Sequence, residues 1–382
     1  ASHSLTPDLP LLACTVWGMD AVMDDKRRHR GALIVGLGAC FRYSALALIP
    51  LVVAWVWMTN GRRRASIVGG VAAVPFALLA VHDALAYGAV HAVAMTGFQS
   101  VSNGPEALFH KAAASLAAFG GAAVLPFLGW SAPRRTVTGS VVGAAIGWVG
   151  AEWAGHSGTA WFATVLSCAA GGASYAGATL VRDRTDRWLL AWMATGAVFL
   201  LGLRFAAARY WIPFFAPAVL IGLRRCPPVV ARAAAVTTVG LSLLLASDDL
   251  DLALTQADAA DVAATVGTGH IAGHWGFQHH LTERGWVSVE DDRPLPPGAW
   301  LAESRIAWPQ EPSNDCFDVS HIVPMMDPNP GLRVHSAEGG ANIHGHSIAG
   351  QPPLAVFAPW SVGTDPMDML TLRRTCPAPT AE

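Results

Sequence analysis

Long apolar stretches separated by short polar segments fill residues 1–246, whereas residues 247–382 mix apolar and polar positions as a water-soluble protein does. A membrane-spanning helix needs roughly 20 mostly apolar residues, so the first part predicts about nine hydrophobic passes. We expect a transmembrane helical domain over 1–246 and a soluble domain over 247–382. The predicted passes are 9–23, 31–58, 66–90, 111–130, 137–155, 159–180, 188–205, 210–223 and 229–246.

Basic residues give these passes a direction. Five short loops hold 15 of the 25 Lys and Arg residues, and cytoplasmic loops are enriched in both residue types. If all five loops lie on one side, the passes between them cross out and return without a leftover segment, and residues 247–382 lie on the outer side. The loops are 24–30, 61–64, 132–135, 181–187 and 224–232.

Residues 31–58 lie between two basic loops but are too few for two full spans. We predict a pair of short helices that turn at 41–44. Broken helices occur at membrane depth only where protein buries them or where they line a watery cavity. This turn is therefore the first indication of a functional site.

The last part of the chain predicts a small α/β domain. Residues 261–271 are expected to end in a strand, 275–284 to form a helix with Gly285 at its C-terminal cap, and 286–289 to continue as a strand. Cys316 and Cys376 are the two cysteines of this part, and they form either a disulfide or two free thiols. The other four cysteines lie in or beside apolar stretches, without the spacing of a metal site.

Composition agrees with a membrane protein. The chain of 382 residues is 53% hydrophobic and 14% charged, against about a quarter charged in a typical soluble domain. The net charge of −2 gives no indication of nucleic-acid binding, and none is predicted. The chain begins at Ala1 in a polar segment without a signal-peptide pattern, and we expect it to be an N-terminally truncated protein.

Ionisable residues within or at the edge of a membrane are costly and mark functional sites by default. Asp8 either caps a helix or faces a polar head group or metal, whereas Arg42 and Tyr43 stand at the predicted turn, where an Arg suits a phosphate. The predicted topology places all the candidates at the outer side. They are Asp8, Arg42, Tyr43, His91, Glu152, His156, Arg204, Arg209 and Tyr210.

Several of these residues also have structural interpretations. Arg204 and Arg209 suit an anionic ligand, although Tyr210 is equally typical of an aromatic belt at the membrane surface. We expect His91, Glu152 and His156 to be loop or interface residues, and Lys111 to extend toward the membrane interface. His274, His279 and His280 raise the possibility of a metal site, but packing of a helix explains them as well and is the preferred interpretation.

Four segments in this order resemble the membrane glycosyltransferases of the GT-C type, and within them the bacterial protein O-mannosyltransferase and aminoarabinose-transferase-like group. They are PDLPL at 7–11, the turn and following Pro within 31–50, RYWIPFFAP at 209–217, and HWGFQ at 274–278. Members usually have Lys where Arg42 stands. They also carry an acid in a first outer loop, upstream of the segment seen here, so this chain is expected to lack that catalytic acid.

The resemblance implies a polytopic α-helical fold in a bacterial inner membrane, with a small extracytoplasmic α/β domain. It implies a glycosyltransferase that moves a sugar from a polyprenyl-phosphate donor to a lipid, protein or polysaccharide acceptor at the outer face, among membrane lipids. Asp8 would be the catalytic or ligand-binding acid, and a divalent metal ion is the candidate cofactor. The donor phosphate would bind Arg42, Tyr43, Arg204, Arg209 and Tyr210. The alternatives are a transporter or flippase for a lipid-linked or anionic substrate, and a non-catalytic membrane scaffold.

Overall fold

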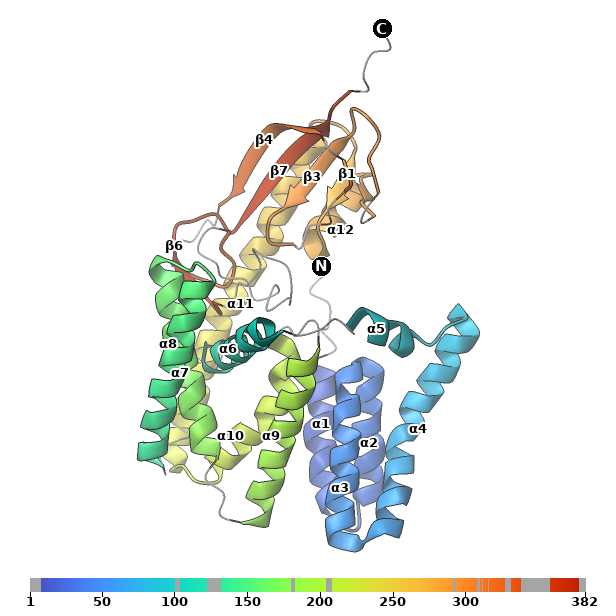
Figure 1. Cartoon of the computed structure of the whole chain (residues 1–382), viewed down its shortest axis with the longest axis vertical. Coiled ribbons are helices and arrows are strands. Elements are labelled where there is room, and N and C mark those ends of the chain that lie inside the picture. The colour runs from blue at the N-terminus through green and yellow to red at the C-terminus, as the bar shows by residue number, and fades with distance from the viewer. Residues whose placement is uncertain are drawn as a thin grey trace.

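Helices make up most of the fold, and a small sheet region follows them (Figure 1). The computed structural model describes residues 8–99, 104–121, 132–179, 183–203, 208–290, 293–307, 310, 312–314, 316–326, 331–337 and 358–377. The helices are α1 (Asp8–Met23), α2 (Arg28–Phe41), η1 (Tyr43–Ala47), α3 (Leu48–Asn60), α4 (Arg62–Tyr87), α5 (His91–Gln99), α6 (Pro105–Gly121), α7 (Pro133–Trp153), α8 (Gly158–Ala178), α9 (Arg184–Gly202), η3 (Ala208–Trp211), α10 (Ile212–Leu223), α11 (Pro228–Ala264) and α12 (Trp275–Glu283).

Three of the described helical segments are long and apolar enough to cross a membrane: Tyr43–Asn60, Arg62–Tyr87 and Pro228–Ala264. In the most apolar windows of the last two, only 22% and 11% of the residues are buried within the protein. Their apolar side chains therefore point outward, which is typical of contact with lipid. Two further apolar helices, Leu9–Met23 and Ile212–Leu223, are shorter.

The basic segments meet at one end of the helix bundle. Arg224 bonds Asp183 and Asp186 at the start of α9, each at 2.8 Å, and Arg225 also pairs with Asp186. Arg184 donates to the Met58 carbonyl near the end of α3, and Arg135 donates to the Thr179 carbonyl after α8. The connections α1–α2 and α3–α4 lie at this same lower end in Figure 1, and the sheet region lies at the opposite end.

Glycine allows α7 and α8 to approach closely. Gly139, Gly143 and Gly147 recur at every fourth position of α7, and the first two are buried against the backbone of α8. A Cβ atom on Gly143 would collide with the carbonyl of Cys168. Small residues with this spacing are typical of helix contacts in membranes, where close backbone packing replaces the hydrophobic effect.

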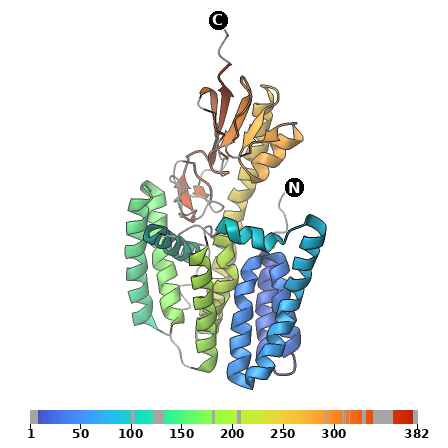
Figure 2. The same cartoon turned by 45° about the vertical axis from the view of Figure 1, so that its right-hand side comes forward.

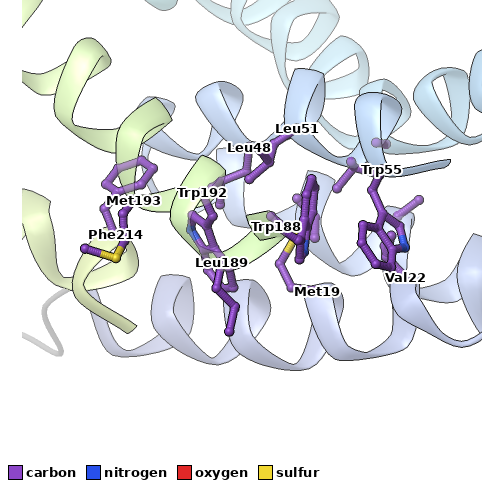
Figure 3. Packing of buried hydrophobic residues seen from close by; sticks show 14 of the residues in the cluster. Met19, Val22, Leu48, Leu51, Trp55, Trp188, Leu189, Trp192, Met193 and Phe214 are labelled. Carbon is purple, nitrogen blue, oxygen red and sulfur yellow. The ribbon is translucent and has the colours of Figure 1, made fainter. Parts of the chain in front are cut away.

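Larger side chains fill the main core between α1, α3, α9 and α10, as Figure 3 shows. Trp188 and Trp192 of α9 are 2% and 1% exposed, and the Trp188 ring lies 5.0 Å from that of Trp55 on α3. Leu48 and Phe214 are buried in the same cluster. In a membrane, close van der Waals packing stabilises such a core, because lipid is as apolar as these side chains and gives no hydrophobic driving force between helices.

Two helices differ from the predictions. The predicted pass at 111–130 overlaps α6, which is described from Pro105 to Gly121. This helix runs at an angle to α8 (Figures 1 and 2) and crosses it near the middle, where Gly120 meets the backbone of Ser167 and Gly171. Residues 122–131 lie outside the described residues. The helix predicted over 229–246 continues as α11 to Ala264, because the sheet region packs against Ala259, Ala260 and Ala263.

The sheet region has five strands in the order β2-β1-β3-β7-β4, and a separate pair, β5-β6. Strand β1 is parallel to β2 and β3, whereas β7 is antiparallel to β3 and β4. The helix predicted after β1 is α12, and Gly285 follows it with a positive φ of 81°. The strands are β1 (His270–Ala272), β2 (Val287–Ser288), β3 (Trp300–Ser304), β4 (Phe317–Met325), β5 (Gly331–Arg333), β6 (Ser361–Gly363) and β7 (Asp368–Thr375).

Covalent and polar contacts hold the sheet region together and fix it to the helices. Cys316 and Cys376 form a disulfide, which decides between the two possibilities that the sequence left open. Asp248 of α11 accepts hydrogen bonds from the backbone of Val334 and His335, at 2.6 and 3.3 Å. Thr159 at the start of α8 donates to the Val362 carbonyl of β6 at 2.6 Å.

Candidate functional site

The break between α2 and α3 lies where the sequence predicted it. Helix α2 ends at Phe41, and Arg42 is extended, with φ −153° and ψ 135°. The chain then forms the 3₁₀ turn η1 before α3 begins at Leu48. Pro50 is tolerated in the first turn of α3, where no intrahelical partner exists for a backbone N–H. The break presents Arg42 and Tyr43 at the end of the bundle remote from the basic segments.

The described part of the site joins two distant sequence segments. The guanidinium carbon of Arg42 lies 4.3 Å from the centre of the Tyr210 ring, and Tyr210 belongs to η3. A cation held over an aromatic face in this way contributes about 0.5–2 kcal/mol, more when water is excluded. The contact orients the planar guanidinium group, whose donors match the oxygens of a phosphate or carboxylate.

Lys111 binds the end of α9. Its side chain is 1% exposed, and the ammonium donates to the carbonyls of Leu201 and Leu203 at the end of α9. The expectation that Lys111 extends toward a membrane interface is therefore wrong. The last carbonyls of a helix lack intrahelical partners and carry a partial negative charge, so they stabilise a buried cation here.

Tyr43 opens onto a pocket of about 400 Å³ at the end of α4. Its hydroxyl lies 2.9 Å from His91 Nδ1, and its ring meets Phe76 edge to face. The pocket combines two phenols, an imidazole and a carboxylate with apolar walls. The lining residues are Tyr43, Asp83, Tyr87, Ala89, His91 and Ala94.

Asp83 is a pocket residue that the sequence reasoning missed. It is 6% exposed, and its nearest described charge partner is His82 Nδ1, at 3.5 Å from the Asp83 carboxylate. The available signal was a single Asp inside a 26-residue apolar helix, which is costly and marks a functional residue by default. His91, expected to be a loop or interface residue, is exposed at the start of α5, and its Nδ1 lies beside the Tyr43 hydroxyl.

The other predicted site residues are only partly described. Asp8 is the first residue of α1 and Arg209 lies in η3, but for both only the backbone is described. Arg204 lies outside the described residues. Of the six predicted site residues, the structure thus brings together the side chains of Arg42 and Tyr210 at one end of the bundle, whereas the Tyr43 ring packs against Phe76 and lies beside His91.

Glu152 and His156 lie in or near the turn between α7 and α8 and have structural partners. Glu152 accepts from the indole nitrogens of Trp148 and Trp161, at 3.3 and 2.9 Å. His156 Nδ1 lies 3.1 Å from the Thr164 hydroxyl. Burial, and next the neighbouring His110, lower the pKa of His156 to about 4, so its imidazole is neutral at pH 7. His156 thus lies in the turn, as expected of a loop residue, whereas Glu152 belongs to the last turn of α7.

Comparison with known proteins gives no relative for this arrangement. No protein-family profile, no curated protein and no solved structure matches the chain. A cation stacked on a phenol ring beside a pocket with a carboxylate and an imidazole can bind an anionic group and exchange a proton.

Proposed function

We propose that this protein is a membrane glycosyltransferase of the GT-C type, which transfers a sugar from a polyprenyl-phosphate donor to an acceptor. The observation that supports the proposal most is the stacking of Arg42 on Tyr210. The two residues are far apart in sequence, yet both belong to segments that resemble this family. The site would lie at the outer face of a bacterial inner membrane, with the sheet region extracytoplasmic.

The proposed reaction is an inverting displacement at the anomeric carbon. The acceptor oxygen forms a bond to this carbon, the bond to the phosphate oxygen breaks, and the bond electrons leave with the lipid phosphate. Arg42 would stabilise the charge that develops on this leaving group, as preorganised cations do in phosphate transfer. The acceptor proton passes to a carboxylate, and Asp83 in the pocket joins Asp8 as a candidate.

We also propose that a divalent metal ion could bind at this site, with Asp8 as one of its ligands. Within the described residues, the pocket beside Tyr43 offers one carboxylate, Asp83, and one imidazole, His91. Protein sites for a tightly held divalent ion usually supply at least three ligands. A metal at this site would therefore need Asp8 or a ligand from outside the described ranges.

The direct test is transfer of labelled sugar from a polyprenyl-phosphate donor by a full-length version, reconstituted in lipid, that includes the upstream acidic loop which the resemblance implies. We expect Arg42→Ala to lower turnover by about 10²–10³, the usual effect of removing one group that stabilises transition-state charge. Arg42→Lys should recover part of this loss, because it keeps the charge but not the fork of donors. Tyr210→Phe should stay near wild type, since the ring remains, whereas Tyr210→Leu should not.

Arg62→Ala is the matched control, because Arg62 is an exposed Arg at the start of α4, away from the site. Equal turnover of Arg42→Ala and Arg62→Ala would contradict the phosphate-binding role of Arg42. Movement of the intact donor across vesicles without cleavage of its sugar–phosphate bond would instead favour the transporter alternative.

A further inference from the structure

A second group of chemically active side chains lies on α12, in the sheet region. His279, His280 and Glu283 occupy a single turn, and one ligand atom from each can be chosen so that all lie within 4.8 Å of one another. His279 Nε2 is 3.5 Å from Glu283 Oε1, and the two imidazole rings are 5.4 Å apart. The sequence pattern favoured a packing role for these histidines, whereas the structure brings two of them close to a carboxylate.

We propose that His279, His280 and Glu283 form a binding site for a divalent transition-metal ion of the zinc class, with an open coordination position. Two imidazoles and one carboxylate are a donor set that suits Zn²⁺, Co²⁺, Ni²⁺ and Cu²⁺ rather than Mg²⁺ or Ca²⁺, which prefer oxygen ligands. This site is independent of the proposed transferase function.

The distances fit an ion after small side-chain rotations. Around a tetrahedral zinc with bonds of about 2.1 Å, neighbouring ligand atoms stand about 3.4 Å apart. The His279–Glu283 pair is already at 3.5 Å. His280 must move by a rotamer adjustment to close the remaining gap, and the side chains of His279 and Glu283, 47% and 60% exposed, are not restrained by tight packing.

The helix beneath the ligands is firmly placed. Phe277 and Leu281, on the opposite face of α12, are fully buried in the core of the sheet region. Gln278 donates to the Ser288 hydroxyl at 2.7 Å, which fixes α12 to β2. A rigid backbone lowers the entropy cost of collecting three ligands on one ion.

Neighbouring charges also favour metal binding. The guanidinium of Arg284 donates twice to Asp261 Oδ1, at 2.9 and 2.6 Å, and once to the His280 carbonyl, at 2.7 Å. Asp261 therefore compensates the nearest cation, and Glu283 keeps its negative charge available for an ion.

The test is a Zn²⁺ titration of the full chain, prepared without a polyhistidine tag and stripped of metal with a chelator. We expect saturable binding of one ion per chain by calorimetry, and a visible absorption spectrum on Co²⁺ substitution. His279→Gln combined with His280→Gln should abolish both signals, and Glu283→Gln should weaken binding about tenfold, equivalent to about 1.4 kcal/mol. His321→Gln is the matched control, because His321 is exposed on β4, away from α12.

A second readout separates metal binding from misfolding. Zn²⁺ should raise the unfolding temperature of the wild type and of His321→Gln, but not of the double variant, because only a ligand of the folded state stabilises it. The metal-free double variant should unfold at the wild-type temperature. Absence of saturable Zn²⁺ binding by the wild type, or equal binding by the double variant, would overturn the site.

Discussion

The helical region, α1–α11, and the sheet region, β1–β7 with α12, differ in where they place their apolar surface. Helices α4 and α11 turn most of their apolar residues outward, and Leu78 and Leu85 of α4 are 66% and 83% exposed. The sheet region instead buries Phe277, Leu281 and Trp286 in a core of its own. Water-driven burial explains the second region, whereas the first needs an apolar surrounding to cover it.

The two regions also stabilise buried acids differently. Asp186 in the helical region bonds two arginines, Arg224 and Arg225. Asp368 in the sheet region is 0% exposed and is held by the Ser304 hydroxyl and by backbone N–H groups, including that of Ile306 at 3.1 Å. In the helical region, ion pairs join the ends of helices. In the sheet region, hydrogen bonds from a hydroxyl and from backbone N–H groups hold a single carboxylate.

The largest effect should come from a charge placed on the outward face of α4. Leu78→Arg should reduce correctly inserted protein, because an Arg near the centre of a spanning helix costs about 3 kcal/mol. Ile322→Arg, the matched change at a side chain 57% exposed on β4, should alter stability by less than about 0.5 kcal/mol. The measurement is the folded fraction extracted from membranes. Equal losses for both variants would contradict the proposed lipid contact of α4.

A smaller effect is expected when a glycine is replaced by alanine, and its sign should differ between a tightly packed helix contact and an open helix surface. Gly143→Ala should destabilise the α7–α8 pair by about 1–3 kcal/mol, because the new methyl group collides with the Cys168 carbonyl. Gly240→Ala in α11 should stabilise by up to about 1 kcal/mol, since no atom lies within 4 Å of its added Cβ and Ala favours a helix. Unfolding temperatures in lipid test both, and a neutral Gly143→Ala would show that α7 and α8 can separate without cost.

Features encoded in short segments could be predicted from the sequence. The grouping of the basic segments at one end follows from their charge. The break at Arg42 follows from the number of residues between two basic loops, which is too small for two full spans. Helix α12 and its glycine cap were predicted by local residue types. In each case a few neighbouring residues decide the outcome, so no tertiary contact is needed.

Features decided by distant contacts were missed. Lys111 is buried because the end of α9 supplies carbonyl groups, and no local pattern indicates this. The pocket role of Asp83 depends on the positions of η1 and α5. The extension of α11 to Ala264 depends on a sheet that packs against its last turns. These arrangements depend on tertiary packing, which a single sequence does not show directly.

The smallest expected effect is a pH dependence of stability in the sheet region, caused by the buried carboxyl group of Asp368. Burial raises the pKa of Asp368 to about 6, although bonds from Ser304 and the backbone oppose this shift. Since the folded pKa lies above the unfolded value of 3.8, ionisation opposes folding. The contribution to stability is therefore fully present below about pH 4 and is lost as the pH rises through about 6.

Lowering the pH from 7 to 5 should accordingly favour the folded sheet region by about 1 kcal/mol through this group alone. Hydrogen exchange of the β7 amides measures it, after correction for the intrinsic pH dependence of exchange. Asp368→Asn should remove this part of the pH dependence, because the side chain no longer titrates, while Asp365→Asn in the preceding turn should keep it. If Asp368→Asn left the pH dependence of β7 unchanged, the carboxyl of Asp368 would not be the group that titrates, and the comparison of the two buried acids would fail at the sheet region.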